Sequence, residues 1–221
     1  MSQQADGGQQ AAALPRLPDF AREHMEAGWE NRALEEQLRR QRDYLVAFLG
    51  DSITAQLGYG HPLIGKAQAA LGGPVGVFGV PGDTVANLMW RLGNGGMPAA
   101  QAYVVQIGTN DVWMCERPEA VVQQIQQLVG YLQAHHPAAH VVLLGLFYMD
   151  ERHNAAKAVN ASLRAWVASA SSPRLHYCTA GDDLSPDLFP DGIHPEDEAW
   201  QQVLDGLTPL LQRLLAAPSS Q

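Results

Sequence analysis

Five short apolar runs, separated by segments with helical spacing, constrain the fold of this chain more than any other feature of its sequence. The apolar runs cover residues 44–49, 75–80, 102–107, 140–146 and 174–178. Runs that are apolar at successive positions are typical of strands buried on both faces, as in parallel sheets. Helical spacing covers residues 84–92, 118–134, 155–170 and 196–215. The alternation predicts a three-layer α/β fold, with about five parallel strands and helices on both faces of the sheet.

Charge and hydropathy exclude several classes of protein. The chain carries 14 Lys and Arg against 23 Asp and Glu, which gives a net charge of −9. This balance argues against nucleic-acid binding, because contact with phosphates requires clustered cations. No apolar run approaches the roughly 18 residues that a membrane-spanning helix needs. The polar first ten residues also lack the pattern of a secretory signal, so we expect no integral membrane association.

The cysteine and histidine patterns predict neither a disulfide framework nor a metal site. Cys115 and Cys178 do not form a C-x-x-C pair, and two thiols of this kind are typical of the reducing cytoplasm. His135, His136 and His140 lack carboxylates at the spacing of metal ligands. We therefore expect a cytoplasmic protein that needs no metal and no cofactor.

Composition divides the chain into one domain with two extensions. Residues 1–18 are rich in Gln, Ala and Gly and contain two prolines, which predicts a flexible N-terminal tail. Residues 19–43 are polar and favour helix, so we expect a surface helix that packs on its own domain or on a second copy in a homodimer. Residues 44–216 form the predicted domain, and residues 217–221 form a C-terminal tail.

Four polar loops mark the predicted functional edge of the sheet. In an open parallel sheet, ligands bind at the carboxyl ends of the strands. The polar loops that follow the apolar runs, or lie near the C-terminus, are residues 50–54, 79–84, 108–111 and 191–195. Together they supply one serine, one glycine-rich turn, one asparagine and an Asp-x-x-His pair.

This set of residues meets the needs of acyl transfer, which requires a nucleophile, a base, a group that orients the base, and oxyanion donors. Ser52 is the candidate nucleophile, His194 the base and Asp191 its orienting partner. The backbone N–H groups of Gly82 and Ser52 and the side-chain amide of Asn110 are the candidate oxyanion donors. Each residue alone fits an ordinary helix cap or turn, but their joint occurrence after successive strands favours catalysis.

These motifs resemble the SGNH hydrolase superfamily, also called the GDSL family of esterases and lipases, over nearly all of residues 44–216. The resemblance implies a flavodoxin-like sheet, a triad of Ser52, Asp191 and His194, and an oxyanion hole formed by Ser52, Gly82 and Asn110. Residues 78–83, 88–92 and 94–95 are also similar to the catalytic subunits of the platelet-activating-factor acetylhydrolase type. Those subunits remove short acyl groups.

The resemblance therefore predicts a serine esterase that hydrolyses carboxylic, short-chain acyl esters of a small molecule, lipid or sugar through an acyl-enzyme. Two alternatives stay open at this point, an acyltransferase that uses the same acyl-enzyme and a non-catalytic ligand-binding module. The α/β-hydrolase fold is disfavoured, because Thr54 stands where its G-x-S-x-G elbow requires glycine.

Two departures from the family pattern bear on the substrate pocket. Val77 stands where the family often has asparagine, and residues 146–148 replace a small or proline-containing loop, which indicates an altered pocket wall. The candidates for contact with substrate lie beside the predicted catalytic loops: Asp51, Trp113, Phe147, Tyr148 and Met149, with Tyr59 and His61 as weaker ones.

The negative charge gathers around the predicted catalytic loop. Residues 182–205 hold eight acids and no Lys or Arg: Asp182, Asp183, Asp187, Asp191, Glu196, Asp197, Glu198 and Asp205. These carboxylates fit a solvated loop and helix start. They also predict a local field that favours neutral or cationic small esters over polyanions.

Overall fold

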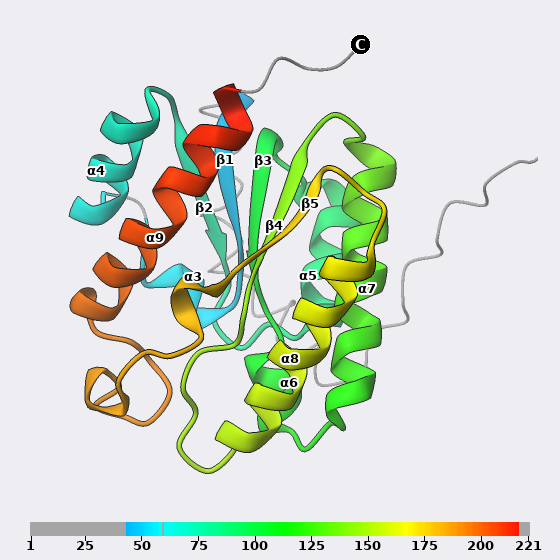
Figure 1. Cartoon of the computed structure of the whole chain (residues 1–221), viewed down its shortest axis with the longest axis vertical. Coiled ribbons are helices and arrows are strands. Elements are labelled where there is room, and N and C mark those ends of the chain that lie inside the picture. Colours follow the sequence, from blue (N-terminus) through cyan, green and yellow to red (C-terminus); the bar gives the residue numbers. More distant parts are fainter. Residues whose placement is uncertain (1–42, 59, 217–221) are drawn as a thin grey trace, which may run out of the picture.

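The computed structural model describes residues 43–58 and 60–216 (Figure 1). The predicted tails, residues 1–18 and 217–221, lie outside these described residues, as does Tyr59. The predicted helix over residues 19–43 also lies outside them, except for its last residue. That residue, Asp43, begins the first strand, so the predicted helix does not extend to position 43.

The core of the fold is a five-stranded parallel sheet with the strand order β2-β1-β3-β4-β5. The strands are β1 (Asp43–Gly50), β2 (Val75–Gly79), β3 (Ala99–Gln106), β4 (His140–Leu144) and β5 (Leu175–Cys178). Gly50 pairs in register with Gly79 on one side and with Gln106 on the other, so three strands end at the same level. This order is that of a flavodoxin-like sheet, and the predicted fold class is confirmed.

Helices cover both faces of this sheet (Figure 1). On one face lie α4 (Pro62–Leu71) and α9 (Asp197–Ala216), which contact each other. On the other face lie α5 (Val85–Arg91), α7 (Pro118–His135) and α8 (His153–Ser169). Each layer has its own apolar cluster, and the two clusters are separated by the sheet. Two short helices, α3 (Ser52–Ala55) and α6 (Thr109–Trp113), lie at the carboxyl ends of β1 and β3.

Helix α4 is the longest element that the sequence analysis did not predict. It begins with His61 as N-cap and Pro62 in its first turn, and Gly72 ends it in a left-handed conformation with φ of 72°. Its buried residues are Leu63, Ile64 and Ala67. Gly65 interrupts this short pattern, so the helix depends on packing against α9 rather than on intrinsic propensity.

The amino edge of the sheet carries a pair of histidines on adjacent strands. Nδ1 of His140 lies 3.0 Å from Nε2 of His176, and Nη1 of Arg174 lies 3.4 Å from Nε2 of His140. Because an arginine only donates, Nε2 of His140 accepts, and its Nδ1–H donates to His176. Burial lowers the pKa of both histidines, and the neighbouring charge of Arg174 adds to this effect at His140.

We expect this histidine pair to make the fold sensitive to acid. The pKa of a free histidine is about 6.5, and both folded histidines titrate below it, so the unfolded chain binds more protons in that window. The stability that the neutral pair confers is complete above about pH 6.5 and is lost as the pH falls below it. Thermal unfolding should therefore show a lower Tm at about pH 5.5 than at about pH 7.5. The drop should be smaller in His176→Gln, whose amide oxygen still accepts from His140; an equal drop would contradict this explanation.

Candidate active site

The turn that follows β1 presents Ser52 at the carboxyl edge of the sheet. Asp51 is the N-cap of α3, and its Oδ1 accepts a hydrogen bond of 3.0 Å from the backbone N–H of Ile53. A Cβ at Gly50 would collide with the carbonyl oxygen of Gln106 and the hydroxyl of Thr54, so the close approach of these segments requires glycine there. The strand, the glycine and the cap together fix the position of Ser52.

Ser52, His194 and Asp191 form one continuous chain of hydrogen bonds. Oγ of Ser52 lies 2.9 Å from Nε2 of His194, and Nδ1 of His194 lies 2.6 Å from Oδ2 of Asp191. An ionised carboxylate only accepts, so Nδ1 carries the imidazole proton and Nε2 is left to accept from the serine hydroxyl. This arrangement is the one that proton removal from a serine requires.

A tight turn holds Asp191 in its ionised form. Its Oδ1 accepts from the backbone N–H groups of Ile193, at 3.0 Å, and of His194, at 2.7 Å. Gly192, which lies between Asp191 and Ile193, adopts a φ of 82°. Partial burial opposes ionisation, but the hydrogen bonds from His194 and Ile193 outweigh it and lower the pKa of Asp191 to about 2. The carboxylate therefore stays charged at every pH near neutrality.

Gly82 and Asn110 are linked through the backbone of Asp83. Gly82 adopts a φ of 82°, in a turn that Asp83 closes by donating its N–H to the carbonyl of Val80 at 3.1 Å. Nδ2 of Asn110 donates to the carbonyl oxygen of Asp83 at 2.9 Å. This bond uses one of the two amide hydrogens of Asn110, and the other is the candidate oxyanion donor.

The order of the strands explains why these loops converge. From β1 the chain first adds β2 on one side, and it then adds β3, β4 and β5 in turn on the other side. The strand order therefore reverses between β1 and β3. Ser52 follows β1 and Asn110 follows β3, and such a switch point is where open α/β sheets bind ligands. The predicted triad and the loops of the predicted oxyanion hole therefore lie at one edge.

Buried carboxyl groups lie directly behind this edge. Asp51 and Asp111 are 0% and 1% exposed, and Asp111 accepts from the backbone N–H of Val85 at 3.1 and 3.3 Å. Burial raises the pKa of both groups to about 7, although backbone N–H donors oppose the rise. The negative charge of Asp83 adds to the rise at both groups, together with Asp111 at Asp51 and Glu116 at Asp111. The interior below the site is thus poor in compensating positive charge.

Three of the predicted substrate contacts face the protein interior. The side chain of Asp51 is fully buried as the cap of α3, so it is not presented to a substrate. Phe147 is 1% exposed and packs on Trp200, with ring centroids 5.2 Å apart, and on Phe189. Met149 is also buried. These residues are therefore buried in the protein interior and do not form the pocket wall.

Trp113 and Tyr148 remain at the surface. Trp113 is 45% exposed and Met114, which the sequence analysis did not single out, is 50% exposed. Trp113 follows Asn110 by three residues and Met114 follows it by four, at the end of α6. This spacing places side chains on one face of a helix. Tyr148 is partly exposed, and its hydroxyl lies 3.1 Å from Oδ1 of Asp150. His61 caps α4 and lies 3.2 Å from Asp197.

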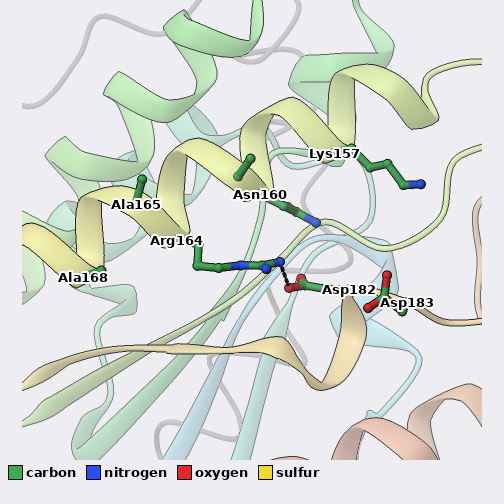
Figure 2. Close-up of a pocket in the computed structure, with 8 residues that line it drawn as sticks. Lys157, Asn160, Arg164, Ala165, Ala168, Asp182 and Asp183 are labelled. Carbon is green, nitrogen blue, oxygen red and sulfur yellow. Dashed lines mark hydrogen bonds and ion pairs between the residues drawn. The ribbon is translucent and has the colours of Figure 1, made fainter.

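A separate groove of about 490 Å³ lies between α8 and the residues after β5 (Figure 2). Arg164 on α8 forms an ion pair with Asp182 across it. The groove is lined by none of the predicted catalytic residues. Within the described part of the chain, no three His, Cys, Asp or Glu side chains are grouped as a metal site requires, and no helix there is long and apolar enough to cross a bilayer.

Known proteins with similar sequences and folds point to one family. The family model of GDSL-like lipases and acylhydrolases matches residues 48–201. Subunit alpha1 of platelet-activating factor acetylhydrolase IB from Rattus norvegicus is 32% identical over 157 residues, which cover 65% of this chain and 66% of the relative. The match thus spans slightly less than two thirds of that relative's length.

Two solved structures share the fold. A GDSL-like lipase from Bacteroides thetaiotaomicron has a TM-score of 0.64 at 19% identity, covering 88% of this chain and 99% of the other. A carbohydrate esterase family 3 protein from Talaromyces cellulolyticus has a TM-score of 0.61 at 16% identity, covering 79% and 98%. At such low identities the likeness bears on the fold alone.

Proposed function

Because the chain belongs to the GDSL-like lipase/acylhydrolase family, as its motifs predicted, we propose that it is a serine esterase that hydrolyses short-chain carboxylic esters. The observation that carries this proposal is the chain of hydrogen bonds from Ser52 through His194 to Asp191. The rat relative is by name an acetylhydrolase, which supports a short acyl group.

The reaction would begin with attack by Oγ of Ser52 on the ester carbonyl carbon. Nε2 of His194 takes the hydroxyl proton as the new C–O bond forms, and Asp191 stabilises the imidazolium that results. The carbonyl oxygen becomes an oxyanion, which the N–H groups of Ser52 and Gly82 and the free amide hydrogen of Asn110 would bind. The imidazolium then protonates the leaving alcohol as its bond to the acyl carbon breaks.

Water would complete the cycle by the same steps in reverse order. His194 removes a proton from water, the resulting hydroxide attacks the acyl carbon, and the second oxyanion occupies the same donors. The bond to Ser52 breaks, and its oxygen regains a proton from the imidazolium. All of the proton transfers pass through one histidine, so neither a metal nor a cofactor takes part in the proposed reaction.

The surroundings of the site suggest which esters it takes. Asp187, Glu196 and Asp197 lie in the acidic stretch around the Asp191–His194 turn, and residues 182–205 contain no Lys or Arg of their own. A field of this sign disfavours anionic substrates and favours neutral or cationic ones. The two thiols are free, with Cys115 exposed and Cys178 buried, and this state fits a reducing compartment such as the cytoplasm.

A series of p-nitrophenyl esters from acetate to palmitate should be hydrolysed fastest at the short end.

We expect Trp113 to contribute binding rather than chemistry. Replacing Trp113 with alanine should raise KM by roughly 2- to 10-fold with little change in kcat, since stacking on an aromatic ring contributes about 0.5–1.5 kcal/mol. Trp113→Phe, which keeps an aromatic face, should recover most of the affinity. Equal KM values for all three proteins would show that Trp113 does not contact the substrate.

The same assay separates hydrolysis from acyl transfer. With an acceptor alcohol added, the products should remain the free acid and p-nitrophenol. Accumulation of the ester of the acceptor would instead indicate an acyltransferase that uses the same acyl-enzyme.

A further inference from the structure

One buried arginine contacts two of the segments that carry the proposed oxyanion donors, those of Ser52 and Gly82. Arg91, the last residue of α5, is 5% exposed, and its Nε donates to Oδ2 of Asp83 at 2.7 Å. Its Nη2 lies 3.3 Å from the carbonyl oxygen of Gly50 and 3.3 Å from that of Phe78. A single guanidinium therefore joins the ends of β1 and β2 to the turn that contains Gly82.

Two of these contacts lie one or two residues from a proposed donor. Gly50 is two residues before Ser52, and Asp83 directly follows Gly82. The carbonyl of Asp83 also accepts from Nδ2 of Asn110, so the arginine reaches the third donor through the same residue. Movement of Asp83 would displace the backbone N–H of Gly82 and the amide of Asn110 together.

The charges around Arg91 also indicate that it stabilises these loops. Among the residues that the structure describes, Arg91 is the only buried Lys or Arg, whereas Asp51, Asp83 and Asp111 are all buried. Asp111 in turn accepts from the N–H of Val85, two residues after Asp83. Arg91 pairs with Asp83, so loss of this one buried cation would leave the Asp83 carboxylate without its opposite charge, and the turn that carries Asp83 would rearrange.

We propose that Arg91 is a positioning residue that holds the backbone of Ser52 and Gly82 and the amide of Asn110 in register as one oxyanion hole. This inference rests on the proposed esterase function for its kinetic consequences only. The guanidinium is planar and offers five donors in a fixed geometry, which matches three acceptors on three segments. A lysine keeps the charge but places one nitrogen at the end of a flexible chain.

Replacing Arg91 with lysine should therefore lower kcat for ester hydrolysis by about 10- to 100-fold, with KM within about twofold of the wild-type value. Ground-state binding changes little, because the donors act mainly on the charge that develops in the transition state. A residue that merely supported the fold would lower the amount of active enzyme, and active-site titration corrects for that loss.

A double-mutant cycle shows whether Arg91 acts through the oxyanion donors. In the wild type, Asn110→Ala should cost about a hundred- to a thousandfold in kcat. In the Arg91→Lys background the same substitution should cost about tenfold or less, because its donor is already displaced. An Asn110→Ala effect of the same size in both backgrounds would overturn the proposal.

Arg164 offers a matched control. It also pairs with an aspartate whose side chain is largely covered, Asp182, but it lies on α8 at the groove of Figure 2 and lines none of the predicted catalytic loops. Arg164→Lys should leave kcat unchanged and should leave the Asn110→Ala effect at full size. If Arg91→Lys does not fold, Asp83→Asn breaks the same ion pair while keeping the backbone, and the cycle is repeated with it.

A measurement without substrate separates this proposal from the esterase proposal. In NMR spectra of the unliganded protein, the Gly82 amide and the side-chain amide of Asn110 should give single sharp signals. Both should broaden or shift in Arg91→Lys and not in Arg164→Lys. Unaltered signals in Arg91→Lys would refute the positioning role, whatever the enzyme assays give, whereas an inactive wild type would refute only the esterase function.

Discussion

Replacing Ser52 with alanine should reduce kcat for ester hydrolysis by about 10⁴- to 10⁶-fold, which is the effect expected for loss of a triad nucleophile. Without Oγ no acyl-enzyme forms, and what remains is catalysis by the oxyanion donors and by proximity. Because Ser52 is a small residue at the sheet edge, its Cβ stays and the packing around it should hold. Initial rates with p-nitrophenyl acetate, compared at equal concentrations of folded protein, measure the effect.

His194→Ala should be as damaging as Ser52→Ala, and combining the two should add almost nothing. Nε2 of His194 is the group within 2.9 Å of the nucleophile, so either loss disables the same step. Residues that act as a unit show this lack of additivity. Effects that multiply in the double variant would mean that the serine and the histidine act in separate reactions.

Replacing Asn110 with alanine should be the next most damaging single change, lowering kcat by about a hundred- to a thousandfold, or roughly 3–4 kcal/mol of transition-state stabilisation. KM should stay close to the wild-type value, because the amide would bind the oxyanion more strongly than the ground-state carbonyl. Steady-state kinetics on one short ester give both constants.

The control for Asn110 is another asparagine on a helix. Asn154 is exposed on α8, and Asn154→Ala should leave both constants unchanged. Asn110→Ala also loses the bond to the Asp83 carbonyl, so its unfolding free energy should fall by about 1 kcal/mol. A kcat within about threefold of the wild type would remove Asn110 from the oxyanion hole.

The sheet and the hydrogen-bonded set of Ser52, His194 and Asp191 follow from local patterns in the sequence. Strands buried on both faces read as continuous apolar runs, and the run ending at Gly50 shows this clearly. The Asp191-x-x-His194 spacing suits a turn in which the carboxylate binds the histidine's own backbone and ring. The loops are then brought together by the strand order, which the short connections strongly limit.

Side-chain direction and long-range partners are harder to predict. Phe147 follows a strand as a pocket-wall residue would, but Trp200 and Phe189, more than 40 positions away in the sequence, cover it. Arg91 looks like an ordinary basic residue in the last turn of a helix. Its buried partners, Asp83 and the carbonyls of Gly50 and Phe78, come from three separate segments, and no local pattern brings them together.

Reaction with a fluorophosphonate probe tests the central claim most directly, since such probes phosphonylate an activated serine and can be located by mass spectrometry of the digested protein. The structure predicts one modified site, Ser52, with labelling lost in Ser52→Ala and strongly slowed in His194→Ala. Absence of labelling in the folded wild-type protein, or stable modification at another serine, would contradict the assignment of Ser52 as the nucleophile of a serine esterase.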